Sequence, residues 1–435
     1  MKKLFFLSMA LLMITAISMG FSDSVTTAND TGAGLFTDSI QAGSLDTSTV
    51  AVRSRYVDVD FDVLGAAWAK RGDVLELNLF NDVSFKAVLK TVKRVSPKGF
   101  AYVGKLQGVG LSSVTMVVED GLIAANIVFP GGAYQVRYAG GGVHVVYEVD
   151  HSAYPPEAEP IPADLPADAG TDDVSAEAVT LVKGSQIEVL VVYTDDARAA
   201  AGGTTAMNTL INLAITETNT SYTNSGITQR VRLAHAEEVS YDESGFNWNT
   251  TLSRLTNTSD GFIDNVHTLR DTYKADEVVL LVADNGYCGM AWLMTTVSNA
   301  FKTKAFALVN WDCATGYYSF GHELGHNMGA RHDWYIDDAK NSPYTYNHGY
   351  VNPGTTSQTR WRTVMAYNNE CSDRGFSCTR IPYWSNPRKK YGGIKMGVAS
   401  KTNSTCTAGN LNHPKCDADN HLVLNKTAKT VAGFR

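Results

Sequence analysis

Three histidines and one glutamate have a spacing that suits a hydrolytic metal site. His322 and His326 are four residues apart, Glu323 directly follows the first, and His332 lies six residues beyond the second. Residues four apart on a helix share one face, so both imidazoles can reach a single ion. Three protein ligands leave the fourth zinc position open for water and substrate, which is typical of catalytic sites. Glu323 is then placed to take a proton from that water.

The third histidine requires the helix to end. Ten residues of continued helix would carry His332 about 15 Å from His322, too far to share an ion. Gly329 stands where the chain must turn back, because glycine adopts a positive φ without a steric penalty. The spacing therefore predicts three zinc ligands, His322, His326 and His332. The alternatives are a polar surface helix with incidental histidines and a structural zinc, which usually takes four protein ligands.

The stretch from His322 to His332 resembles the zinc signature of the metzincin metalloproteases, in which a methionine turn follows. Arg362–Tyr367 is similar to that turn, and the resemblance implies that Met365 forms an apolar floor under the zinc histidines. Asp333 is similar to the aspartate of the reprolysin-like branch, which braces the turn without binding metal. Across residues 185–435 the chain most resembles bacterial peptidyl-Asp metalloendopeptidases, in the stretches Val191–Asp195, Tyr287–Ala291, Cys313–Ser319 and Arg380–Pro387.

This resemblance implies an α/β (α+β) catalytic domain with a mixed twisted sheet and a helix that carries the zinc ligands. It implies Zn²⁺ as cofactor and a secreted endopeptidase for protein or peptide substrates, which cleaves on the N-terminal side of Asp. Tyr367 shares the Met-x-Tyr spacing of the astacin and serralysin branches, where the hydroxyl binds zinc and then stabilises the transition state. A ring that only packs below the zinc helix is the alternative for Tyr367.

An acid-specific pocket needs a buried cation, and arginine can bind a substrate carboxylate through two hydrogen bonds. In the resembling enzymes, the segment after the methionine turn walls the pocket for the residue just after the cleaved bond. Here that segment contains Arg374, Arg380, Pro382, Tyr383 and Trp384. Arg362 and Arg380 are the first candidates for the cation, and a solvated or structural arginine is the alternative for each.

The sequence predicts five segments. Lys2 and Lys3 before an apolar run to Met19 predict a signal peptide over 1–22 and hence export, with a retained anchor as the alternative. Residues 23–55 are polar and small and predict a flexible segment. Alternating strands predict a β-rich propeptide domain over 56–150, and 179–435 form the catalytic domain. Between them, 151–178 hold five prolines and seven acids without Lys or Arg, which predicts an exposed linker.

Periodicity predicts the elements. Strands are expected in the first half over Val57–Val63, Val74–Phe80, Phe100–Val103, Val114–Val118, Leu122–Phe129, Tyr134–Tyr138 and Val143–Val149. In the second half, strands are expected at Ile187–Tyr193, Arg230–Ala236 and Val278–Val282, with Phe306–Val309 as an edge strand beside the substrate groove. Helices are expected over Thr204–Tyr222 and Phe262–Tyr273, from Tyr318 onwards, and over Leu422–Phe434.

The predicted order of segments is that of a zymogen in which the propeptide is an intramolecular inhibitor; a permanent two-domain enzyme is the alternative. Residues 1–287 contain no cysteine, so a cysteine cannot silence the zinc. Asp150 or His151 could occupy the open zinc position, or the domain could block the cleft sterically. Self-cleavage near Asp172 or Asp173 could mature the enzyme.

All six cysteines lie beyond residue 287, and their even number in an exported chain predicts disulfides. Fifteen pairings are possible. Pairing of neighbours is our expectation: Cys288 with Cys313, Cys371 with Cys378, and Cys406 with Cys416.

The net charge of −7 argues against a nucleic-acid partner, and after the N-terminal run no long apolar stretch predicts a membrane partner. The histidines at 144, 235, 267, 348, 413 and 421 show no ligand spacing. Two other functions remain open at this stage: a secreted binding or adhesion module with a vestigial zinc site, and a zinc amidohydrolase acting on a non-protein amide. The intact glutamate and histidines favour the endopeptidase.

Overall fold

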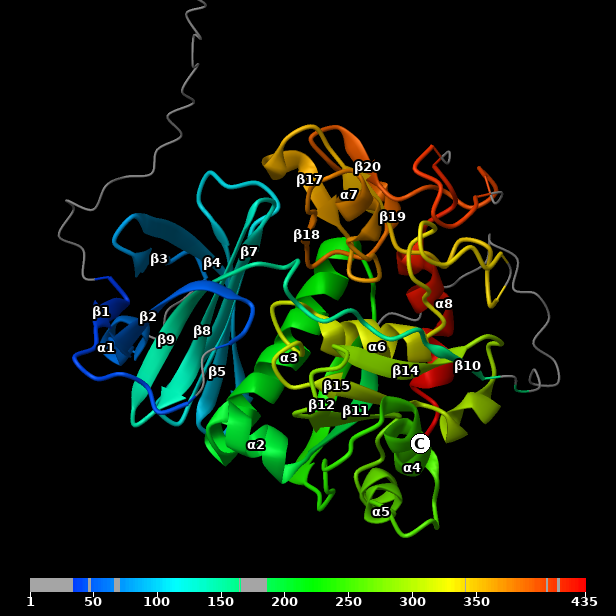
Figure 1. Cartoon of the computed structure of the whole chain (residues 1–435), viewed down its shortest axis with the longest axis horizontal. Helices are drawn as coiled ribbons and strands as arrows, with labels where there is room; N and C mark the ends of the chain where they lie inside the picture. Colours follow the sequence, from blue (N-terminus) through cyan, green and yellow to red (C-terminus); the bar gives the residue numbers. More distant parts are fainter. Residues whose placement is uncertain are drawn as a thin grey trace, which may run out of the picture.

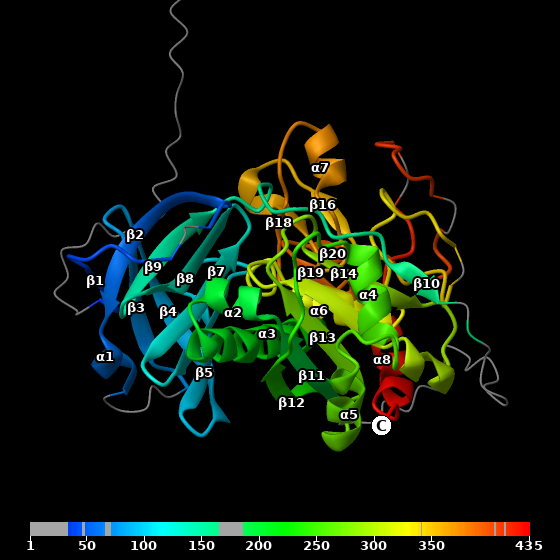
Figure 2. The ribbon, with the colours of Figure 1, turned by 60° about the horizontal axis from the view of Figure 1, so that its bottom comes forward.

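The structure is a computed structural model that describes residues 34–45, 48–65, 71–163, 165, 186–340, 342–403, 406–412 and 415–435. The predicted signal peptide and the proposed cleavage sites at Asp172 and Asp173 lie outside these residues. A β-rich half and a mixed α/β half stand side by side, with one long helix between them (Figures 1 and 2).

Nine strands of the described chain form an antiparallel sheet, here called the N-terminal sheet, in the order β1-β2-β9-β8-β7-β6-β5-β4-β3. The sheet curls until its edges approach, and the Leu35 amide donates to the Glu76 carbonyl of β3 at 3.1 Å. Alternate side chains fill its interior, among them Leu77, Met116 and Val146. The strands are β1 (Phe36–Asp38), β2 (Ala51–Val59), β3 (Val74–Phe80), β4 (Val83–Ser96), β5 (Gly99–Leu106), β6 (Ser113–Glu119), β7 (Leu122–Phe129), β8 (Gly132–Gly140) and β9 (Val143–Val149), with the short helix α1 (Phe61–Gly65) after β2.

Six further described strands form the central sheet, in the order β10-β14-β15-β13-β11-β12. Four of them run parallel, β14 lies antiparallel to β15, and β10 lies parallel to β14. Their bounds are β10 (Ile161–Ala163), β11 (Gln186–Tyr193), β12 (Arg230–Glu238), β13 (Glu277–Val282), β14 (Gly289–Met294) and β15 (Phe306–Asn310).

Helices cover both faces of the central sheet, and this explains the unbroken apolar runs in its middle strands. In β13, Leu280 joins the core under helices α4 and α5, while Leu281 joins the core under α3 and α6. The helices of this half are α2 (Asp195–Ala201), α3 (Thr204–Ser225), α4 (Trp248–Thr256), α5 (Asn265–Thr272), α6 (Ser319–Asn327), α7 (Asn369–Asp373) and α8 (Asn420–Val431), with 3₁₀ turns at Asn299–Thr303 and Ser357–Thr359.

Helix α3 is buried on two sides because it lies between the two sheets (Figure 2). Ile211 faces the central sheet, whereas Leu213 packs on Ala101, Val117 and Ala124 of the N-terminal sheet. A helix that packs on both sides must carry apolar residues around most of its circumference, so it lacks the one-sided pattern of a surface helix.

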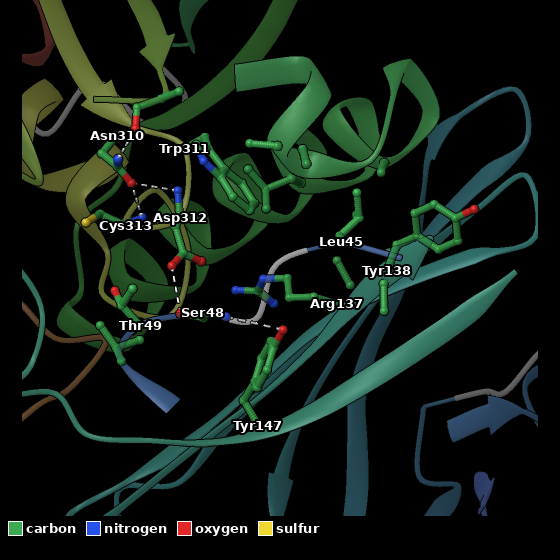
Figure 3. A pocket seen from close by; sticks show the side chains of 18 of the residues that line it. Leu45, Ser48, Thr49, Arg137, Tyr138, Tyr147, Asn310, Trp311, Asp312 and Cys313 are labelled. Atoms are coloured by element: carbon green, nitrogen blue, oxygen red, sulfur yellow. Dashed lines mark hydrogen bonds between the residues drawn. The ribbon is translucent and has the colours of Figure 1, made fainter. Parts of the chain in front are cut away.

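The two halves also meet through polar contacts around a cavity of about 370 Å³ (Figure 3). Ser48 Oγ donates to Asp312 Oδ2 at 2.8 Å beside the buried Arg137. Arg137 of β8 donates to Thr315 Oγ1 at 2.7 Å, and Asn126 of β7 donates to Glu217 Oε1 of α3 at 2.9 Å. The N-terminal sheet is therefore bound to the other half by specific buried hydrogen bonds as well as by apolar contact.

After β9 the chain crosses in front of α6 and then forms β10, which pairs with β14 (Figure 1). This differs from the exposed linker that the composition predicted, because Tyr154, Glu157 and Ala158 are buried at 7 %, 3 % and 3 % exposure. Strand β10 also makes β14 an interior strand and places β15 deeper still. The prediction of Phe306–Val309 as an edge strand was therefore wrong.

The C-terminal part is rich in loops, with small sheets of β16 (Val351–Pro353), β17 (Arg360–Arg362) and β18 (Thr379–Arg380), and of β19 (Asn386–Tyr391) and β20 (Ile394–Met396). The expected disulfides are confirmed: Cys288–Cys313, Cys371–Cys378 and Cys406–Cys416. Over the part of the chain that the structure covers, no helix combines the length and apolarity needed to cross a bilayer.

Candidate metal centre and substrate cleft

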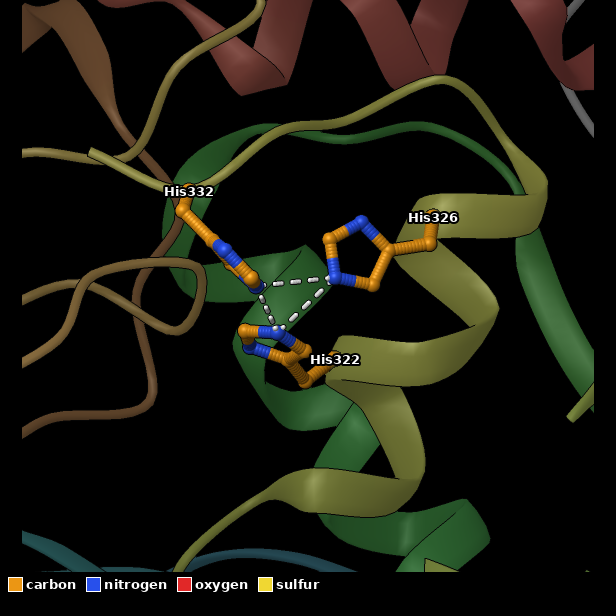
Figure 4. A group of neighbouring side chains, drawn as sticks. All are labelled: His322, His326 and His332. Carbon is orange, nitrogen blue, oxygen red and sulfur yellow. Dashed lines mark hydrogen bonds between the residues drawn. The ribbon is translucent and has the colours of Figure 1, made fainter. Parts of the chain in front are cut away.

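The three predicted histidine ligands come together at one point (Figure 4). His322 and His326 lie on α6, and His332 reaches them from the loop that follows. Each pair of Nε2 atoms is 3.1 Å apart, and all three side chains are fully buried. Tetrahedral zinc with bonds of about 2.0–2.1 Å would hold its ligand nitrogens about 3.3 Å apart, so the triangle has the size that zinc requires.

Hydrogen bonds on the outer nitrogens make this triangle an electron-rich site. His322 Nδ1 lies 2.9 Å from the Val364 carbonyl, and His326 Nδ1 lies 2.8 Å from the Ala330 carbonyl. A carbonyl only accepts, so each Nδ1 carries the proton and each Nε2 presents a lone pair. Burial lowers the pKa of both imidazoles well below the ordinary value, which keeps them neutral. Lone pairs facing one another at this separation suit a shared cation.

The chain reversal that brings His332 back towards α6 occurs at Gly329, as predicted. Helix α6 ends at Asn327, and Gly329 has φ of 88°, in the left-handed region. The Ala330 amide then donates back to the Gly325 carbonyl at 2.9 Å, which closes the helix end and reverses the chain. His332 follows two residues later at the position where its Nε2 meets those of the helix.

Glu323 is fully buried, and neither carboxylate oxygen has a hydrogen-bond partner among the described residues. Its side chain lies against Gly289 at the start of β14, where a Cβ would stand 2.6 Å from Glu323 Cγ. Burial raises the pKa of this carboxyl well above its usual value, and the nearby Glu157 adds to the effect. A buried, unpaired carboxyl beside the histidine triangle has the properties of a general base.

Met365 of the predicted methionine turn and Asp333, which follows the third histidine, support the triangle. Met365 is fully buried, and a Cβ on Gly325 would lie 3.0 Å from its sulfur, so the thioether sits under the turn that joins the helical histidines. Asp333 accepts from the Tyr367 amide at 2.8 Å and from the Tyr335 amide at 3.1 Å. Burial raises the pKa of Asp333 to about 6. These contacts fit the bracing role that the sequence predicts for Asp333.

The Tyr367 ring lies 4.3 Å from the His332 ring between centroids, at the mouth of the triangle. Its hydroxyl donates to the backbone carbonyl of Glu157 at 2.7 Å. The hydroxyl thus already binds a peptide carbonyl of the connecting segment, which ring packing alone would not require.

The two candidate arginines have different roles. Arg362 is bound on three sides, since it donates to the carbonyls of Ala366 and Cys378 at 2.6 and 3.1 Å and to the Tyr317 hydroxyl at 3.2 Å. It therefore ties the methionine turn to its surroundings and has no free face for a substrate. Arg380 is equally buried, but its Nε and Nη2 have no partner among the described residues.

Arg380 is packed against Tyr317. Its guanidinium lies 4.2 Å from the centroid of the Tyr317 ring, and Nη1 donates to the Tyr317 carbonyl at 3.0 Å. The other predicted wall residues are less central: Arg374 pairs with Glu370 at 2.9 Å, and Trp384 donates to Ser221 at 2.8 Å behind α6.

Glu157 is the site residue that the sequence analysis missed. Its Oε1 accepts from Arg380 Nη1 at 2.5 Å and from Ser319 Oγ at 2.8 Å, with Glu157 and Arg380 fully buried at their side chains. A carboxylate oxygen of Glu157, a ring nitrogen of His322 and a carboxylate oxygen of Glu323 lie within 4.8 Å of one another. Its place among prolines and acids is typical of a linker, and no local pattern marked it as a site residue.

The predicted blocking residues Asp150 and His151 do not reach the triangle. Asp150 is exposed and accepts from Ser152, while the His151 ring packs edge-on against Tyr317 at 5.7 Å. Two other acids of the same connection do come close: a carboxylate oxygen of Glu157 lies near His322, and Glu159 Oε2 lies 3.7 Å from His332 Nδ1.

Comparison with known proteins agrees with this geometry. Residues 183–385 match the family model described as metallopeptidase family M12, so the half that carries the histidines is a metallopeptidase domain. A peptidyl-Asp metalloendopeptidase of Stenotrophomonas maltophilia (strain R551-3) is 41 % identical over 334 residues, which cover 74 % of this chain and 71 % of that protein. Another, from Xanthomonas campestris pv. campestris, is 38 % identical over 344 residues, covering 78 % and 74 %.

The chain therefore belongs to the family of peptidyl-Asp metalloendopeptidases and is a zinc metalloendopeptidase. Among solved structures, metalloproteinase-II from Bacteroides fragilis is 14 % identical and aligns with a TM-score of 0.39 over 69 % of this chain and 90 % of that one. That likeness is too low to inform the fold.

Proposed function

We propose that the chain is the precursor of a secreted zinc endopeptidase that cuts peptide bonds on the N-terminal side of acidic residues, Asp above all. The observation that carries the proposal is the triangle of Nε2 atoms 3.1 Å apart beside a buried glutamate that has no hydrogen-bond partner among the described residues. In this proposal His322, His326 and His332 hold Zn²⁺, which when bound supplies Lewis acidity and lowers the pKa of a water in the open position.

The roles of the protein residues follow from their positions. Glu323 takes the proton of the attacking water and passes it to the leaving amine. The Tyr367 hydroxyl donates to the oxyanion that develops on the scissile carbonyl, a role supported by its present bond to the Glu157 carbonyl. Met365 and Asp333 position the histidines and take no part in the chemistry.

Arg380 gives the pocket its preference for an acid. Its free Nε and Nη2 form the side of the guanidinium that can bind a carboxylate through two parallel hydrogen bonds. The names of the relatives support an Asp preference, since both are called peptidyl-Asp metalloendopeptidases. We propose Arg380 in place of Arg362, whose donors are engaged by the protein itself.

The segment boundaries complete the proposal: a signal peptide over 1–22, a propeptide domain over 56–150, a linker over 151–178 and a catalytic domain over 179–435. The expectation of a flexible segment over 23–55 needs correction, because β1 and the start of β2 lie within it and pair in the N-terminal sheet. The disulfides Cys288–Cys313, Cys371–Cys378 and Cys406–Cys416 support an oxidising location outside the cell. The buried hydrogen bonds between the two halves support a domain that binds the catalytic half until it is removed.

Cleavage-site profiling tests the function. The mature enzyme is incubated with a mixed peptide library, with and without a zinc chelator, and the cut sites are read by mass spectrometry. We expect cuts before Asp, their loss with chelator or in Glu323→Gln, and loss of the acid preference in Arg380→Gln. Cuts without acid enrichment would contradict the pocket, and activity that ignores the chelator would contradict the metal mechanism.

A further inference from the structure

His332 is held differently from the two histidines on α6. The rings of His322 and His326 are each oriented by a hydrogen bond from Nδ1 to a main-chain carbonyl. His332 Nδ1 has no hydrogen-bond partner among the described residues. It also lies beyond the helix, so neither helix geometry nor an outer hydrogen bond fixes its ring. Its position must therefore come from the main chain of the loop and from packing of the ring on Tyr367.

The main chain at His332 is bound by a further histidine, His348, which lies outside the zinc motif. His348 is fully buried, and its Nδ1 lies 2.8 Å from the His332 carbonyl oxygen. Its Nε2 lies 2.8 Å from the carbonyl oxygen of Ala339. A carbonyl only accepts a hydrogen bond, so a ring nitrogen that bonds it must carry a proton. The ring of His348 thus stands between the carbonyl of the third histidine and a later point of the same loop.

The ring of His348 has little freedom to move. It stacks on the Trp334 indole with 4.0 Å between the ring centroids and 26° between the planes. The indole is itself fixed, since its Nε1 donates to the Asp417 carbonyl at 2.6 Å. The main chain of His348 is held by Ser385, whose Oγ donates to the His348 carbonyl at 2.6 Å. A side chain fixed in this way can hold the carbonyl that it bonds in one place.

The residues on either side of this histidine bind the same loop. The Asn347 carbonyl accepts from the Arg331 amide at 2.7 Å, and the Gly349 amide donates to the Arg331 carbonyl at 3.1 Å. Gly349 also lies against the main chain of Met365, where a Cβ would stand 2.8 Å from the Met365 carbonyl carbon. Residues 347–349 therefore lie between the loop that carries the third histidine and the methionine turn.

We propose that His348 is a positioning residue for the metal, and that its hydrogen bond to the His332 carbonyl sets where the third imidazole stands. This role rests on the proposed function, in which His332 is a zinc ligand. Replacement of a residue that orients a metal ligand typically lowers metal affinity by about 10–100-fold. His348 differs from the usual case because it acts through the main chain of the ligand and not through its ring.

Two substitutions in the full chain separate the two bonds of the ring. Asn carries its side-chain amide nitrogen near the position of Nδ1, whereas Gln carries it near the position of Nε2. His348→Asn can therefore keep the bond to His332, and His348→Gln only the bond to Ala339. We expect the zinc Kd, measured by chelator competition, to rise about 10–100-fold in His348→Gln and to stay within about 3-fold of the unsubstituted chain in His348→Asn.

Cobalt substitution gives a readout that a loss of stability alone would not change. Co²⁺ in place of zinc absorbs visible light with an intensity that depends on its coordination geometry. A displaced third ligand should therefore alter the cobalt bands in His348→Gln and leave them unaltered in His348→Asn.

His144→Gln is the matched control, because it makes the same substitution at a buried histidine of the N-terminal sheet. The His144 ring accepts from the Ile123 amide at 3.1 Å and takes no part in the metal site. This variant should at most lower the free energy of unfolding, with the zinc Kd and the cobalt bands unchanged.

Ser385→Ala is a milder variant for the case that the substitutions at His348 prevent folding. It removes the hydroxyl that holds the His348 carbonyl and leaves both bonds of the ring in place. We expect its zinc Kd to rise above that of His144→Gln by less than about 10-fold. An unchanged Kd in this variant would then overturn the proposal.

Where the variants fold, their comparison decides. An unchanged zinc Kd in His348→Gln would overturn the proposal. Equal losses of affinity in His348→Gln and His348→Asn would overturn it as well, since they would assign the ring a packing role. A loss confined to His348→Asn would do the same, because it would give the role to the bond with Ala339.

His332→Ala separates this proposal from the proposed function. If it leaves the zinc Kd unchanged, His332 is not a ligand and the proposed metal site fails. If it abolishes zinc binding while His348→Gln binds zinc as the unsubstituted chain does, the proposed function stands and the positioning role of His348 fails.

Discussion

At the scale of single residues, the geometry of the site depends on individual hydrogen bonds and close contacts that orient the functional side chains. The outer nitrogens of His322 and His326 are held by carbonyls, which sets the direction of the inner nitrogens. The acid–base and oxyanion groups are also positioned by close contacts. Glu323 lies against the backbone of Gly289, and the Tyr367 amide donates to the Asp333 carboxylate. Two substitutions test these placements.

Tyr367→Phe removes one hydroxyl and leaves the ring against His332. If the hydroxyl stabilises the oxyanion, kcat should fall about 100-fold with little change in KM, because loss of one such donor typically costs 10²–10³. Zinc content should stay the same. Tyr241→Phe, which removes a hydroxyl bonded to Thr251 far from the triangle, is the control. Full turnover by Tyr367→Phe would assign the ring a packing role only.

Gly289→Ala tests the need for a close approach of β14 to the base. The new Cβ would stand 2.6 Å from Glu323 Cγ, a distance that forces the glutamate to move. We expect kcat to fall at least about 10-fold, as a displaced general base loses part of its 10²–10⁴ contribution, while zinc binding is retained. Gly433→Ala, whose Cβ would meet atoms no nearer than 3.4 Å, serves as the control. Unchanged kcat would show that Glu323 tolerates the shift.

At the scale of elements, the helix end after α6 determines whether three ligands can meet. Gly329 combines φ of 88° with close neighbours, since a Cβ there would stand 2.7 Å from Pro343 Cγ and 3.2 Å from the Met294 carbonyl. Gly329→Ala should lower the unfolding free energy by about 1–3 kcal/mol and weaken zinc binding, because His332 is displaced. Chelator competition measures the zinc affinity, and denaturant titration measures the stability.

Gly203→Ala is the matched control for this helix end. Its φ is 108°, so a side chain is strained there too, but a Cβ would meet nothing within 4 Å. We expect a loss of stability without any change in zinc affinity. Equal zinc affinities for the two variants would mean that the turn at Gly329 does not position His332.

The metal triangle could be predicted from the sequence because all its determinants lie in eleven consecutive residues, where helix geometry and one glycine suffice. The long helix α3 and most strands were also predicted, since their apolar spacing is local. Strand β4 was missed, because its lysines alternate with apolar residues on a face that is largely exposed. The predicted edge position of Phe306–Val309 was wrong for a different reason. Strands β14 and β10 lie outside it in the sheet, and no local sequence pattern shows that they pair there.

Glu157 could not be found in this way because its partner Arg380 is 223 residues distant. The residues around it have the composition of a solvated linker, and the free energy that orders them comes from the cleft of the other half. Sequence periodicity reports which residues an element buries within its own fold. It does not report a segment that is buried by contacts with a distant part of the chain, as Glu157 is by Arg380.

At the scale of the whole molecule, the contact between the two halves should depend on pH through Glu217. This side chain of α3 accepts from Asn126 of the N-terminal sheet and from the Gly316 amide, and burial raises its pKa to about 7. An acid whose pKa is raised in the folded state favours that state when protonated. Its contribution is therefore complete below the ordinary value of 4.5 and is lost as the pH rises through 7.

Denaturant unfolding of the full chain at pH 5 and pH 8 measures this contribution. With the cited values, Glu217 should make the chain about 2–3 kcal/mol more stable at pH 5 than at pH 8, relative to Glu217→Gln, which cannot titrate. Taking the difference between the two proteins removes the effect of other groups, such as Asp333, that titrate in both. Glu119→Gln, at the same interface and bonded to Asn212, controls for the loss of one carboxylate. If the N-terminal sheet is the propeptide, as proposed, the same sign means that neutral or alkaline conditions favour its release. A difference that stays constant between pH 5 and pH 8 would show that Glu217 is already ionised in the assembled molecule and that burial at this interface does not favour acid.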